Sequence, residues 1–96
     1  MTKIEIYRKI CDDAANLYVA KNGDYGAAYA NLRKKYPNLI LIHLNEKLSR
    51  LEQLMSQGYE AQVSESIDDT LRDIAGYAQM ELTERMYDNL KSVPLS

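Results

Sequence analysis

Three acidic residues in the second half of the chain share the spacing of one helical face. Glu65, Asp69 and Asp73 follow one another at intervals of four residues, which places them in a line on a helix. Such a line repels itself by about 0.2–0.5 kcal/mol per adjacent pair. Asp68 has a local partner in Arg72 four residues on. Asp69 and Asp73 have none, so we expect them to bind a metal ion or basic groups.

The same line continues through Gly76 and Met80. A glycine costs a helix interior about 1 kcal/mol relative to alanine, and an exposed methionine has no clear use on a solvated face. Close approach of another helix would explain both residues. The line lies opposite the apolar stripe of this helix, which consists of Ile67, Leu71, Ile74, Ala78 and Leu82.

A second set of charged residues precedes this segment. His43, Glu46, Lys47 and Arg50 fall on one face of a helix. Lys47 and Arg50 can hold a phosphate, while Glu46 adds a carboxylate. Oxygen ligands suit Mg²⁺, which usually bridges one or two carboxylates to substrate phosphates. The predicted metal ligands are Glu46, Glu65, Asp69 and Asp73. Without a ligand, the same charges would form interhelical ion pairs only.

Local signals define the helices that must position these residues. Thr2 and Glu5 form a capping box that begins a first helix, which runs to about Lys21. Residues 21–26 form a glycine-rich loop, and a second helix covers 27–36. Pro37 ends that helix, and Asn38 caps the next.

Two longer helices follow. The third covers about 39–57 and stops at Gly58, and its apolar stripe is Leu41, Leu44, Leu48, Leu51 and Met55. Ser64 caps a fourth helix that covers about 65–90. No alternating run predicts a strand. We expect an all-α fold, a compact bundle of about four helices in a single domain over residues 1–96.

Composition excludes several classes of partner. The net charge of −2 provides no general attraction for a nucleic acid polymer, and the single cysteine argues against a disulfide or a zinc site. No apolar run approaches the length of a membrane span. These features predict a cytoplasmic protein that does not bind membranes.

Three segments together resemble the nucleotide modification associated domain family, which is common in bacteriophage genomes. They are 21–26 (KNGDYG), 46–51 (EKLSRL), and 65–71 running into 73–78 (ESIDDTL, DIAGYA). The resemblance spans about residues 17–82. It implies nucleotide chemistry and a helical fold distantly similar to the MazG-like all-alpha nucleoside triphosphate pyrophosphatases.

Those enzymes use a Glu-x-x-Glu pair on one helix and a Glu-x-x-Asp pair on the next to bind Mg²⁺. Glu65 and Asp68 match the second pair, with Asp69 and Asp73 available in a shifted register. The first pair is broken, because Ser49 stands three residues after Glu46. This departure affects hydrolysis more than binding, so no catalytic residue is assigned.

The leading hypothesis is therefore a phage-type nucleotide-binding protein. It is either a Mg²⁺-dependent pyrophosphatase or a non-catalytic protein that sequesters a nucleotide such as a host antiviral defence signal. A structural helical oligomer is the remaining alternative. One copy encloses too little volume to bury a ligand, so we expect a homodimer or larger. The expected ligand-binding residues are Lys21, Asp24, Tyr25, His43, Lys47, Arg50 and Tyr77.

Overall fold

The computed structural model describes residues 1–21, 26–58 and 60–92. Four helices follow one another along the chain: α1 (Lys3–Lys21), α2 (Ala27–Lys35), α3 (Leu39–Met55) and α4 (Ala61–Ser92). The described residues form no strand. The predicted all-helical fold with four helices is confirmed. None of the described helices combines the length and apolarity that crossing a lipid bilayer would require.

Local sequence signals set three of the helix boundaries. The capping box is present: the Thr2 backbone N–H donates to Glu5 Oε2 at 3.4 Å, and the Glu5 N–H donates to Thr2 Oγ1 at 3.2 Å. Tyr36 leaves the helical conformation at φ −127° and ψ 87°, because the following Pro37 disfavours it there. Gly58 takes a φ of +95° just after α3, a conformation that glycine adopts without a steric penalty.

The beginnings of α3 and α4 differ from the prediction. Ser64 does not cap α4, because its N–H already donates to the Glu60 carbonyl at 2.9 Å and α4 begins at Ala61. Asn38 does stand at the N-cap of α3, but its side chain makes no capping hydrogen bond. Its carbonyl instead accepts from the N–H groups of Leu41 and Ile42.

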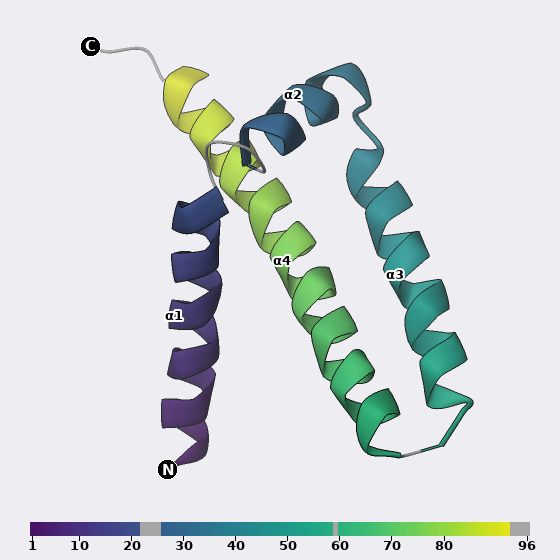
Figure 1. The fold of residues 1–96 in the computed structure, drawn as a ribbon. Coiled ribbons are helices and arrows are strands. Elements are labelled where there is room, and N and C mark those ends of the chain that lie inside the picture. The colour runs from purple at the N-terminus through teal and green to yellow at the C-terminus, as the bar shows by residue number, and fades with distance from the viewer. Residues whose placement is uncertain (22–25, 59, 93–96) are drawn as a thin grey trace.

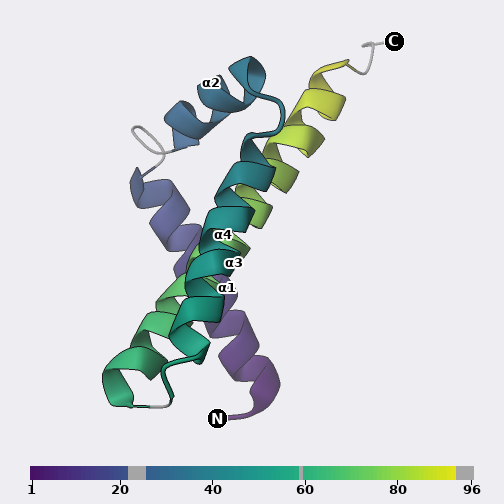
Figure 2. The same ribbon diagram turned by 90° about the vertical axis from the view of Figure 1, so that its right-hand side faces the viewer.

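The helices are arranged around α4, the longest of them. In Figure 1, α3 descends beside α4, and the two form an antiparallel hairpin. α2 crosses the upper end of this hairpin, and α1 lies on the side of α4 away from α3, as both views show (Figures 1 and 2). The core is small, with Tyr29, Leu39 and Met80 packed together and Tyr77 partly buried against them. α1 contributes no buried residue.

The face that α4 turns toward α3 is not the one with the most apolar residues. Met80 is only 8% exposed, and Thr70 is buried with its hydroxyl donating to the Ser66 carbonyl at 2.7 Å. Leu71 and Leu82, from the expected apolar stripe, are 48% and 58% exposed. On the line from Glu65 to Met80, Met80 packs into the core, whereas the side chains of Asp69 and Asp73 are 68% and 53% exposed.

The expectation of a close helix approach at Gly76 is wrong. A Cβ atom added at Gly76 would meet no other atom within 4 Å. The absence of a side chain at this position is therefore not required by packing within the chain.

Replacing Gly58 or Gly76 by alanine should change the free energy of unfolding in opposite directions. Gly58→Ala should lower the free energy of unfolding by about 1 kcal/mol, because a Cβ strains the left-handed backbone. Gly76→Ala, in open space within α4, should raise it by about 0.5–1 kcal/mol through helix propensity. Urea unfolding at one fixed protein concentration measures both. Equal stability of Gly58→Ala and the wild type would contradict the assigned turn.

Candidate functional site

The charged faces of α3 and α4 meet at one ion pair. Lys47 Nζ lies 3.3 Å from Asp73 Oδ2. The lysine side chain is largely withdrawn from solvent at 21% exposed, whereas Asp73 is 53% exposed. Of the predicted cations and carboxylates, Lys47 and Asp73 are therefore the two that the structure brings together across these helices.

Next to this pair, two rings stack across the same helices. The rings of His43 and Tyr77 are nearly parallel, with an interplanar angle of 7° and centroids 4.2 Å apart. Tyr29 of α2 lies against both, with ring centroids at 6.3 Å and 6.4 Å. His43 and Tyr77 are half-buried, so part of this aromatic cluster reaches the surface.

Asp69 does have a local partner, contrary to the prediction. Arg72 Nη1 lies 2.9 Å from Asp69 Oδ1, and both side chains are about two-thirds exposed, at 66% and 68%. Arg72 thus pairs with the acid three residues before it rather than with Asp68. An exposed pair of this kind adds little stability.

Glu46, Arg50 and Glu65, which were also predicted to bind a ligand, lie on open surface. Glu46 and Arg50 line a shallow depression on α3 together with Ser49, Glu52 and Gln53. Glu65 is exposed near the start of α4. Within the described residues, no three His, Cys, Asp or Glu side chains gather into a metal site. The carboxylates that remain can supply the one or two ligands that Mg²⁺ takes beside phosphate oxygens.

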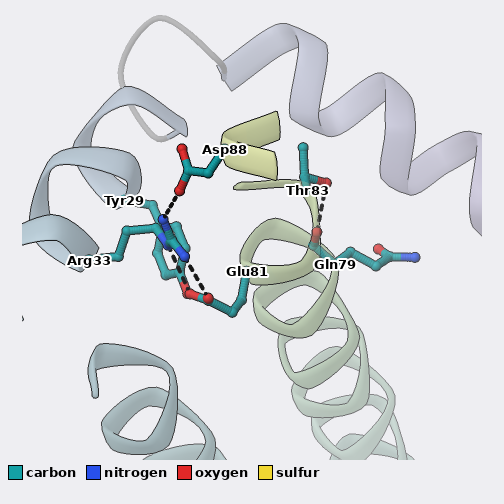
Figure 3. A network of polar contacts seen from close by, with 6 residues as sticks. All are labelled: Tyr29, Arg33, Gln79, Glu81, Thr83 and Asp88. Carbon is teal, nitrogen blue, oxygen red and sulfur yellow. Dashed lines mark hydrogen bonds and ion pairs between the residues drawn. The ribbon is translucent and has the colours of Figure 1, made fainter. Parts of the chain in front are cut away.

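A network that the sequence did not predict fastens α2 to α4 (Figure 3). Arg33 donates two hydrogen bonds to the carboxylate of Glu81, at 2.9 Å and 3.1 Å, and a third to Asp88 at 2.9 Å. The Tyr29 hydroxyl donates to Glu81 Oε1 at 2.9 Å. This bidentate arrangement holds Tyr29 in place beside the rings of His43 and Tyr77.

Partial burial makes this network electrostatically strong. The side chains of Arg33 and Glu81 are only 16% and 15% exposed. Hydrogen bonds from Arg33 lower the pKa of Glu81, despite its burial. Burial and the bond to Glu81 raise the pKa of Tyr29, so its hydroxyl stays protonated and remains a donor. The hydrogen bond to Glu81 raises the pKa of Arg33.

Comparison with known protein families identifies the family of this sequence. A protein-family model described as nucleotide modification associated domain 1 matches residues 21–84. The chain belongs to this family. No curated protein and no solved structure gives a significant match.

The segment that matches nucleotide modification associated domain 1 includes the whole of α2. It also includes both contacts between α3 and α4, the His43–Tyr77 stack and the Lys47–Asp73 ion pair. Its first residue, Lys21, is the last residue of α1. The predicted ligand-binding residues Asp24 and Tyr25 lie outside the described residues. Asp88, which completes the Arg33 network, follows the matched segment.

A weak sequence signal for the network existed. Tyr29 and Arg33 are four residues apart, as on one helical face, and Glu81 and Asp88 are seven apart. No local sequence pattern connects Tyr29 and Arg33 with Glu81, because about half the chain separates them.

The network predicts a defined response to acid. Because the pKa of Glu81 is lowered in the folded state from its usual 4.5, its stabilisation is complete above that pH and is lost as pH falls below it. Glu81→Gln should cost about 2 kcal/mol at neutral pH, between the values for exposed and buried pairs. It should also flatten the acid dependence of stability.

A surface pair supplies the control. Asp13 pairs with Lys9 at 2.9 Å, with both side chains 63% exposed. Asp13→Asn should cost less than about 0.5 kcal/mol and leave the acid dependence intact. Urea unfolding between pH 3 and 7 measures both variants. Equal losses in the two variants would show that the Arg33 network adds no more than a surface pair.

Proposed function

We propose that the chain binds a phosphorylated nucleotide across the exposed side of the α3 and α4 seam. Family membership supports a role connected with nucleotides, because the family description refers to nucleotide modification. The proposal rests mainly on one observation: a stacked aromatic pair and a charged pair are adjacent on the same two helices.

The spacing of these pairs is regular on both helices. His43 and Lys47 are four residues apart on α3, and Asp73 and Tyr77 are four apart on α4. The antiparallel packing matches His43 with Tyr77 and Lys47 with Asp73. Rings and charges therefore lie about one helical turn apart. A nucleotide presents a flat base and an anionic phosphate on either side of one sugar, so it suits this arrangement.

Lys47 is the residue best placed to hold the phosphate. An ammonium group has three donors, and the ion pair of Lys47 with Asp73 spans 3.3 Å, longer than a strong charge-assisted hydrogen bond. A phosphate oxygen can therefore join or replace the carboxylate. Arg50, one turn further along α3, adds a second cation at the surface. The exposed rims of His43 and Tyr77 would face the base.

The proposal also includes a metal ion, a choice between binding and hydrolysis, and a biological setting. Asp73 beside Lys47, or Asp69 one turn before it, would supply a carboxylate to a Mg²⁺ ion, which would add charge neutralisation at the phosphates. Ser49 stands where the similar pyrophosphatases have a carboxylate, and this favours binding, or sequestering of a nucleotide, over hydrolysis. A bacteriophage origin, a distant MazG-like kinship and a cytoplasmic location complete the proposed biological setting.

Substitution of the lysine tests the site. Lys47→Gln should weaken binding of the best ligand from a panel of nucleoside mono-, di- and triphosphates, cyclic nucleotides and NAD by at least about tenfold. The reason is that a hydrogen bond to a charged group contributes about 1.5–3 kcal/mol. Isothermal titration calorimetry measures the loss. Lys9→Gln, on α1, should bind as the wild type does.

The same panel separates the alternatives. Pyrophosphate release in the presence of Mg²⁺, abolished by Asp69→Asn, would establish catalysis, whereas ligand recovered unchanged after denaturation would establish sequestering. A ligand at 100 times its dissociation constant adds about 2.7 kcal/mol to stability. If no member of the panel raises the melting temperature, the nucleotide site is refuted and the structural alternative remains.

A further inference from the structure

The α3 and α4 hairpin carries a second set of apolar residues that the fold leaves uncovered. On α3, apolar residues recur at alternating intervals of three and four: Leu41, Leu44, Leu48, Leu51 and Met55. The corresponding stripe on α4 is Ile67, Leu71, Ile74, Ala78 and Leu82. This heptad-like repeat is typical of helices that pack in bundles. We refer to these ten residues as the apolar flank of the hairpin.

Burial shows that the two stripes lie beside the helix contact rather than in it. The residues nearest the contact, such as Leu51 and Ile74, are half-buried. The outer positions are open, with Leu48 46% and Leu71 48% exposed, and Leu82 58%. The contact line of each helix runs through the residues that face the other helix, such as Lys47 on α3 and Tyr77 on α4. Viewed from the N-terminus of each helix, the apolar stripe is rotated away from this line in the same direction on both helices. Two antiparallel right-handed helices therefore bring both stripes to one side of the hairpin.

The proposed nucleotide site is on the other side. Glu46 and Arg50 on α3, and Asp69 on α4, are offset from the contact line in the opposite rotational sense. The hairpin thus has a charged flank on one side and the apolar flank on the other.

The exposed area of the chain is too large for a packed monomer. A folded protein of 11.0 kDa is expected to expose about 5,600 Å², whereas this chain exposes 7872 Å². The radius of gyration is 16.1 Å, against about 12.5 Å for a globular chain of this length. Among the residues that the structure describes, no side chain is less than 2% exposed. The fold thus leaves about 2,200 Å² more surface in water than a monomer of its mass.

We propose that the apolar flank is covered by a second copy of this chain, so that two hairpins form a four-helix bundle. A standard stable interface needs about 800 Å² from each partner, and obligate dimers bury roughly 2,000–5,000 Å² in total. The excess area of each chain, to which the apolar flank and the unburied α1 both contribute, is larger than the area that a stable interface needs from one partner. Matching stripes on two helices of one copy suit a two-fold interface, in which the same surface serves both subunits. The charged flank, and with it the proposed nucleotide site, stays open in this dimer.

The mass in solution tests the proposal directly. Light scattering after size exclusion should give twice the 11.0 kDa of one chain at micromolar concentration. Leu48→Glu combined with Leu71→Glu should return the mass to that of one chain, because the interface would then bury unpaired carboxylates. The control combines Leu17→Glu with Leu32→Glu, leucines of α1 and α2 that are 56% and 44% exposed. It should remain a dimer.

Two results would overturn the proposal. One is a wild-type protein of 11.0 kDa throughout the concentration range, and the other is a Leu48→Glu/Leu71→Glu protein that stays dimeric. Circular dichroism shows whether that variant keeps its helices. If the variant unfolds, the melting temperature of the wild type distinguishes the two states. This temperature rises with protein concentration for a dimer and is constant for a monomer.

Discussion

The contact between Arg33 and Glu81 fixes the position of α2, and the rest of the fold depends on this position. A planar guanidinium that donates two bonds to one carboxylate tolerates little change in distance or angle. Because Pro37 ends α2 a few residues later, fixing α2 also determines where α3 begins beside α4. Tyr29 then lies against the stacked rings of His43 and Tyr77. It also packs with Leu39 and Met80 to form the core.

The register of the α3 and α4 hairpin follows from this starting point. Since the two helices are antiparallel and share one spacing, aligning His43 with Tyr77 also aligns Lys47 with Asp73. A shift of either helix by one residue would rotate these side chains by about 100° and separate both pairs. The His43–Tyr77 stack and the Lys47–Asp73 ion pair therefore both depend on the same register of α3 against α4, and α2 sets this register at its end of the hairpin.

The sequence predicted the features with local causes. The Thr2 capping box, the stop at Pro37 and the turn at Gly58 depend on neighbouring residues only, and all three are confirmed. The orientation of α4 could not be predicted from its own pattern. Its buried face lies between the apolar stripe and the acidic line, with Thr70 and Met80 buried and Ile74 half-buried. Met80 packs against Tyr29 of α2, a contact that the pattern of α4 alone does not contain. The Arg33 network has no local cause, because its partners lie on separate helices.

α1 has a different relation to the fold from the other three helices. It contains 19 residues and none of them is buried, so its stability comes mainly from its own hydrogen bonds, its capping box and side-chain pairs such as Lys9 with Asp13. Helices held mainly in this way open without the rest of a protein. Backbone amides of α1 therefore exchange with solvent through local fraying, whereas those at the centre of α4 exchange only when the hairpin itself comes apart. The free energy of local opening is therefore lower for α1 than for the α3 and α4 hairpin.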